Sequence, residues 1–215
     1  MRTHSGARFW MAVLLLGVGL SHCAELQPVR LPPPQTDGGK PLMQALKHRR
    51  TIRQFNSKPL PQQVLSDLLW AAFGVNRPDN GHRTAPSALN AQELDLYVIT
   101  AEGAFVYEAG PHQLRPVASG DLRGLTGSQP FVKETPVSVV FVADLTRLAR
   151  AKPADREFYA AVDTGYVSQN IYLFCASEGL ATVVHDLDRA PLARAFQLRP
   201  DQRIILAQAV GYPQD

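Results

Sequence analysis

Hydrophobic residues recur with two different periods along the chain, and each period predicts its own kind of element. Between residues 62 and 73 the apolar positions repeat every three or four residues, as they do on the buried face of a helix. Pro61 and Gly74 flank this segment and are typical of a helix start and a helix end. Residues 137–143 are instead an almost entirely apolar run rich in valine, broken only by Ser138, which predicts a strand buried on both faces.

The same criteria predict a mixed order of helices and strands along the rest of the chain. We expect helices at about 41–49, 62–73, 155–177 and 189–197, and strands at about 94–100, 104–107, 113–118, 137–143, 181–185 and 203–210. The second and third of these strands would pair across the turn Ala109-Gly110-Pro111. Because helices and strands do not alternate regularly, the order favours an α+β fold.

Residues 1–24 have the features of a secretory signal peptide. Arg2 and Arg8 precede an apolar run that is too short to span a bilayer comfortably, and small residues follow it. Cleavage after Cys23 would release an exported, periplasmic protein, whereas lipidation of Cys23 would leave a membrane-anchored lipoprotein. His22 fits the lipidation motif poorly, so we favour simple export. An uncleaved membrane anchor is the third alternative.

Composition divides the rest of the chain into a leader and one domain. Residues 25–40 are rich in proline and glycine, which predicts an extended leader. Residues 41–215 are long enough to bury a core as one domain. The full chain carries 22 Lys and Arg against 19 Asp and Glu, without a basic stripe, so nucleic-acid binding is not favoured. The histidines lack the spacing of a ligand pair, so no metal site is predicted.

A basic cluster follows the first predicted helix. Arg49, Arg50 and Arg53 lie close together, with Thr51 among them. Arginine presents a planar fork of donors that binds phosphate bidentately, and the threonine hydroxyl adds a neutral donor. The pattern is typical of a site for a small phosphorylated ligand. The alternative is a solvated basic helix end that favours the helix dipole.

Several segments resemble the nitroreductase-like flavoprotein superfamily. The stretch 49–55, RRTIRQF, is similar to the opening signature of that superfamily, and 86–92, PSALNAQ, is similar to its loop before a core strand. The phrase 83–88 resembles most the branch of dehydrogenases that oxidise azoline rings in modified peptides. Residues 163–170 resemble the long central helix, and 210–213 the final strand. The resemblance spans about residues 41–213.

This resemblance implies a fold, a cofactor and an assembly. The family fold is α+β, with a central, mostly antiparallel sheet flanked by helices, and its homodimers bind FMN between the subunits. By position, Arg49, Arg50 and Thr51 would hold the FMN phosphate and ribityl chain, and Arg53 would lie near the pyrimidine edge of the ring. Part of the ring would be covered by three residues of the partner subunit, Pro86, Ser87 and Asn90.

The chain departs from the family pattern at three places. His185-Asp186 replaces a Glu-Gly pair whose backbone faces the flavin N5 in many relatives. The family's C-terminal Lys or Arg at the phosphate is not found after Pro213, and Glu93 replaces an aromatic residue. We expect the backbone of His185 to contact the flavin while its ring faces solvent; the alternative is a ring that donates a proton there.

Two further residues belong to predicted helix 155–177. Asp163 is expected to be buried with a hydrogen-bonding partner, because an unpaired buried carboxylate would be costly. Cys175 is expected to be an inert core thiol.

The resemblance implies an FMN-dependent oxidoreductase of the nitroreductase or dehydrogenase type. It would transfer two electrons in a ping-pong cycle, to or from a small organic substrate, between a small-molecule donor and acceptor. An exported enzyme would need a donor other than NAD(P)H. The alternatives are a flavin- or ligand-binding protein without turnover, and an enzyme that modifies the flavin.

Overall fold

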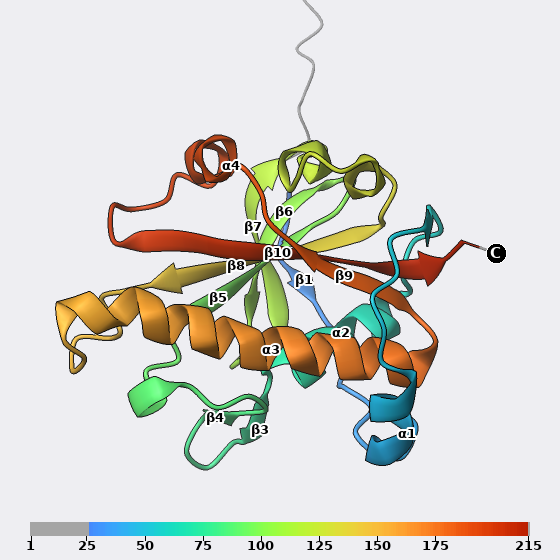
Figure 1. Cartoon of the computed structure of the whole chain (residues 1–215), viewed down its shortest axis with the longest axis horizontal. Helices are drawn as coiled ribbons and strands as arrows, with labels where there is room; N and C mark the ends of the chain where they lie inside the picture. Colours follow the sequence, from blue (N-terminus) through green and yellow to red (C-terminus); the bar gives the residue numbers. More distant parts are fainter. Residues whose placement is uncertain (1–25, 215) are drawn as a thin grey trace, which may run out of the picture.

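One eight-stranded sheet organises the computed structural model, which describes residues 26–214 (Figure 1). Its strands run in the order β1-β7-β6-β5-β8-β10-β2, and β9 also pairs with β10. Every pairing is antiparallel. The strands are β1 Val29–Arg30, β2 Phe55–Asn56, β5 Leu94–Ile99, β6 Gly103–Glu108, β7 Gln113–Ser119, β8 Val137–Asp144, β9 Ala181–His185 and β10 Gln202–Pro213. The predicted α+β class and antiparallel sheet are confirmed. The predicted signal peptide lies outside the described residues.

Helices cover both faces of the sheet. They are α1 Leu42–His48, α2 Gln62–Phe73, α3 Arg156–Glu178 and α4 Arg189–Ala195. The side chains of α2 and α3 share one hydrophobic cluster with one face of the sheet, and those of α4 share a second cluster with the other face. The long α3 crosses the front of the molecule, and α4 lies on the opposite side of the sheet (Figure 1).

The strand β8 is buried on both faces of the sheet, which explains why nearly all its residues are apolar. All its residues are buried, and successive side chains point to opposite faces of the sheet. Val139 and Phe141 pack with α2 and α3, whereas Val140 and Val142 pack with α4. The predicted buried central strand is therefore confirmed.

The leader is extended, as predicted, but it packs against the domain. Val29 pairs with Leu114 of β7, and Leu31 is only 4% exposed. Farther along, the backbone N–H of Lys40 donates to Ser177 Oγ of α3 at 2.7 Å. Residues 26–40 are thus a part of the folded unit rather than a spacer in front of it.

Two further short pairings, besides that of β1 with β7, were not predicted. The strand β10 extends to Pro213, three residues past the predicted end, because its last residues pair with β2. A small hairpin joins β3 (Val75–Arg77) to β4 (His82–Arg83). Segments of two or three residues are too short to show a hydrophobic period. No helix within residues 26–214 combines the length and the hydrophobicity needed to cross a membrane.

Candidate functional site

The basic cluster lines a cavity of about 330 Å³ between α1, the C-terminal end of α3 and the end of β10. Figure 1 shows α1 beside that end of α3. The residues that line the cavity include Arg49, Arg50, Lys40 and Lys47. Four permanent cations around one small cavity are suited to a ligand that carries a phosphate group.

Tyr172 of α3 holds the predicted signature in place. Its ring centroid lies 5.3 Å from the guanidinium carbon of Arg49, within the range of a cation–π contact. Its hydroxyl lies 3.2 Å from Thr51 Oγ1 and accepts the backbone N–H of Val184 at 3.0 Å. The backbone N–H of Arg49 also donates to Ala45 and closes α1. The wall of the cavity is therefore tied to α3 and β9.

The structure separates the three predicted arginines. Arg49 and Arg50 line the cavity, whereas Arg53 is exposed and is not part of its wall. Thr51 is exposed, and its hydroxyl contacts the hydroxyl of Tyr172, which lines the cavity. Of the predicted cluster, the structure thus brings Arg49, Arg50 and Thr51 together at one place.

His185 ends β9 with a buried ring, so the expectation that this ring faces solvent is wrong. The residue is 8% exposed, and its ring meets Phe131 edge-on with 5.4 Å between centroids. Nδ1 lies 3.3 Å from the carbonyl oxygen of Asp186, and Nε2 has no partner among residues 26–214. Burial lowers the pKa of His185, so the ring is neutral at pH 7. Asp186 is exposed and pairs with Arg189 at 2.8 Å.

The loop that carries Pro86, Ser87 and Asn90 lies elsewhere on α3. The backbone N–H of Ala88 donates to Asp163 Oδ2 at 2.7 Å, which confirms that buried Asp163 has a partner. Asp163 precedes Tyr172 by nine residues, which corresponds to roughly 13 Å along a helix. Within one chain these loop residues and the cationic cavity are therefore separate, as a site built from two chains would require.

The comparison with known proteins decides the family. Residues 46–212 match the nitroreductase family. The chain belongs to the nitroreductase family. It is 32% identical over 153 residues to the nitroreductase-family protein MJ1384 of Methanocaldococcus jannaschii. The matched region covers 66% of this chain and 76% of that protein. This membership places the chain among the flavin-dependent oxidoreductases in general terms.

Solved structures show the nitroreductase fold. A nitroreductase-family protein from Ralstonia eutropha JMP134 is 41% identical, with a TM-score of 0.83 over 87% of this chain and 90% of that chain. A chain of the E. coli microcin synthetase McbBCD complex with truncated pro-MccB17 bound has a TM-score of 0.68 over 97% of this chain and 85% of that chain. At 18% identity, the second likeness shows a shared fold alone.

Sequence reasoning missed several residues of this nitroreductase-family site. Lys40 and Lys47 line the cavity, and the Lys40 ammonium group donates to the carbonyl oxygen of Ala176 at 3.1 Å. Tyr172 was missed because nothing in its local sequence shows that it faces the arginines. Cys175, predicted as a core thiol, is buried, and this burial raises its pKa.

A second carboxyl group lies buried beside Asp163. Glu93 is fully buried, and neither of its carboxylate oxygens accepts a hydrogen bond from any group in residues 26–214. Burial, together with the neighbouring Asp163, raises the pKa of Glu93 to about 7. Two ionised carboxylates cannot donate to each other, so we infer that Glu93 keeps its proton and donates it to Asp163.

Proposed function

We propose that this protein is an FMN-dependent oxidoreductase that transfers two electrons to or from a small organic substrate. Family membership supports the general class. The observation that carries the specific cofactor is the cavity whose wall holds Arg49, Arg50, Lys40 and Lys47. We further propose that the protein is exported, as the pattern of residues 1–24 predicts.

The residues of the cavity fit the phosphate end of FMN. A phosphate ester carries close to two negative charges at neutral pH, and the arginines and lysines supply cations on several sides. Lys40 is held at the C-terminal end of α3 by its contact with Ala176. In this arrangement Arg49 and Arg50 bind the phosphate, and Thr51 contributes a hydroxyl group beside Tyr172.

Bound FMN would supply reversible two-electron transfer, alternating between a small-molecule donor and an acceptor. The chain would orient the cofactor and set its charge environment. Arg53 supplies a cation outside the phosphate cavity, and His185 supplies a neutral ring that lies buried against Phe131. Burial lowers the pKa of His185, which favours the neutral imidazole over the imidazolium.

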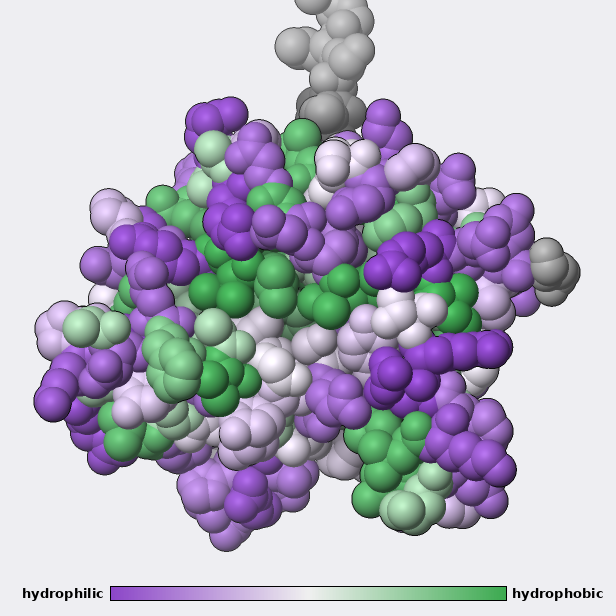
Figure 2. Space-filling view, in the orientation of Figure 1, coloured by the Kyte–Doolittle hydropathy of each residue, from purple (hydrophilic) through white to green (hydrophobic). Residues whose placement is uncertain are grey.

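We also propose a homodimer, supported by apolar side chains left exposed on this chain. Phe158, Val162 and Tyr166 recur every four residues and form one exposed stripe of α3. Leu42 and Met43 of α1 are also exposed. Figure 2 shows apolar side chains over α1 and over the N-terminal half of α3. A second copy on this face would shield them from water and would provide its own 86–90 loop.

The proposed phosphate site can be tested by comparing FMN with riboflavin, which lacks the phosphate. Arg50→Ala should weaken FMN binding about tenfold or more and leave riboflavin binding unchanged, because a charged hydrogen bond contributes about 1.5–3 kcal/mol. Arg53→Ala should weaken both ligands alike if Arg53 lies near the ring. Binding is measured by quenching of flavin fluorescence.

Two results would contradict the proposal. Failure of the wild-type protein to bind FMN would remove the cofactor, and equal loss of both ligands in Arg50→Ala would remove the phosphate from this cavity. Turnover is tested separately by mixing the FMN-loaded protein with electron donors and recording the flavin absorbance. Binding without bleaching by any donor would favour a flavin-binding protein that lacks turnover.

A further inference from the structure

A second cavity, of about 570 Å³, lies on the sheet face that α4 covers. Tyr97, Val106 and Arg115 are register partners on β5, β6 and β7, so their side chains lie in one row on that face. Phe196, just after α4, stacks on Tyr97 with 4.6 Å between ring centroids. Phe196 and the residues Gln197 and Arg199 that follow it also line the cavity.

The wall of this cavity carries an excess of positive charge, and three of its arginines are ion-paired. Two carboxylates line it, those of Asp95 and Glu108. Four arginines also line it: Arg83, Arg115, Arg147 and Arg199. Burial lowers the pKa of Arg83 and the nearby charge of Arg147 lowers it further, whereas Tyr107 and Asp95 act in the opposite direction. An anion between the arginines would relieve their repulsion.

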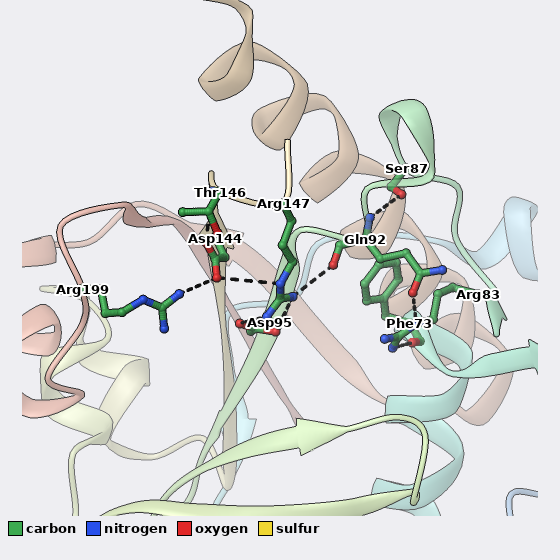
Figure 3. Close-up of polar contacts among 9 residues, drawn as sticks. All are labelled: Phe73, Arg83, Ser87, Gln92, Asp95, Asp144, Thr146, Arg147 and Arg199. Atoms are coloured by element: carbon green, nitrogen blue, oxygen red, sulfur yellow. Dashed lines mark hydrogen bonds and ion pairs between the residues drawn. The ribbon is translucent and has the colours of Figure 1, made fainter. Parts of the chain in front are cut away.

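The arginines differ in how fully their donors are used, as Figure 3 shows in part. Arg147 makes three side-chain hydrogen bonds: it binds both Asp95 oxygens at 2.9 and 3.0 Å and also the carbonyl oxygen of Gln92. Arg115 donates to Glu108 through Nε alone, and Arg199 donates its side chain to Asp144 through Nη2 alone. Within residues 26–214 the other guanidinium N–H groups of Arg115 and Arg199 have no acceptor.

We propose that this cavity is a binding site for a small organic anion with two negative charges, carried by carboxylate or phosphate groups. The N–H groups of Arg115 and Arg199 that are not used by Glu108 and Asp144 would bind the charged oxygens. The stacked rings of Tyr97 and Phe196 form an apolar wall for the carbon part of the ligand. The cavity volume falls in the range of roughly 300–1,000 Å³ that is usual for small-molecule sites.

Ligand binding would also reach the 86–92 loop. Arg83 donates to Gln92 Oε1 at 3.0 Å, and Arg147 donates to the Gln92 carbonyl oxygen at 3.1 Å. The backbone N–H of Gln92 then donates to Ser87 Oγ at 2.9 Å. Figure 3 shows this chain of contacts from the cavity to Ser87. An anion that fixes the arginines should therefore reduce local opening of residues 87–92.

The binding site is tested by isothermal titration of the full chain with succinate and, separately, with inorganic phosphate. We expect saturable binding of at least one probe, and which probe binds distinguishes a carboxylate ligand from a phosphate ligand. The double variant Arg115→Ala/Arg199→Ala should lose at least about tenfold in affinity. Arg194→Ala removes an exposed arginine of α4 that does not line the cavity, and it should bind as the wild type does.

Phosphate can also enter the first cavity, so its titration is repeated on Arg50→Ala. Phosphate binding that survives this change and is lost in the double variant belongs to the second cavity. Hydrogen exchange of the wild-type protein gives a readout that depends on no variant, since succinate or phosphate should slow exchange in residues 87–92. The proposal is overturned if neither probe binds, if the double variant binds as tightly as the wild type, or if Arg194→Ala weakens binding equally.

Discussion

Glu93 occupies a position in the core where a carboxylate would be expensive. It lies directly before β5 and beneath the loop that Asp163 holds through Ala88. A buried acid without a donor stays neutral by keeping its proton, and a nearby acid strengthens this effect. A protonated Glu93 can donate a hydrogen bond to Asp163, so the two residues together form a link between loop and helix.

This link predicts a pH dependence of stability. The pKa of Glu93 is raised from 4.5 to about 7, so the native state holds its proton more tightly than the unfolded state does. The contribution of Glu93 to the free energy of unfolding should therefore not change with pH below about pH 4.5. It should fall as the pH rises to about 7, and stay lowered above that. Glu93→Gln cannot ionise, and should be more stable than the wild type above pH 7 by up to about 3 kcal/mol.

Urea denaturation at pH values on either side of this window measures the effect. Glu102→Gln makes the same chemical change at an exposed position and should leave the pH profile as it is in the wild type. If the wild type and Glu93→Gln lose stability in parallel between the two pH values, Glu93 is not the group responsible.

At the scale of elements, one turn connects the leader to the cationic cavity. Gly39 has a φ of +87°, and an added Cβ would lie 2.6 Å from Ser177 Oγ. That same hydroxyl accepts the backbone N–H of Lys40. The conformation of Gly39 therefore sets the position of Lys40 at the end of α3, where its ammonium group enters the cavity wall.

Gly39→Ala should destabilise the protein by about 1–2 kcal/mol, because the left-handed conformation and the contact with Ser177 both oppose a Cβ. It should also weaken FMN more than riboflavin, since Lys40 would move. Gly38→Ala is the matched control, as a Cβ there meets nothing within 4 Å. Thermal unfolding and flavin binding are measured on both variants. An equal loss in the two variants would show that the turn is not specific.

The elements that sequence predicted are those whose hydrophobic period is long enough to read. The strand β8 and the helix α2 agree with their predicted ranges within one residue, since each buries a regular pattern of its own. The strand β1 has two residues and exists only because β7 offers an edge. Nothing within so short a segment reports a partner that lies far along the chain.

The same limit applies to the site. Arg49, Arg50 and Thr51 could be predicted because arginine chemistry and a local signature coincide in one stretch. Lys40 could not, because its position depends on a hydrogen bond to Ser177, 137 residues away. The burial of the His185 ring likewise depends on Phe131, which comes from another segment of the chain. Local chemistry identifies candidate residues, whereas tertiary packing decides which of them share a cavity.

At the scale of the whole molecule, the exposed apolar stripe of α3 is the feature that a monomer does not explain. Val162 is 37% exposed and lies between Phe158 and Tyr166, which are 66% and 48% exposed. Covering large apolar side chains that lie in a row removes them from water and lowers the free energy of the protein. In the proposed dimer a second copy covers this row and brings its Ser87 and Asn90 toward the flavin.

Val162→Asp should therefore convert a dimer to a monomer, because the new carboxylate would have to be buried without a partner at the interface. We expect the dissociation constant of the dimer to rise at least about a hundredfold, equivalent to roughly 2.7 kcal/mol, measured by size exclusion with light scattering.

Leu125→Asp is a matched control, since Leu125 is also 37% exposed but lies outside the stripe. Its variant should stay dimeric. FMN binding should fall with dimerisation in Val162→Asp, because residues of the second chain complete the proposed flavin site. A monomeric wild type, or a Val162→Asp variant that remains dimeric, would contradict the assignment of this face.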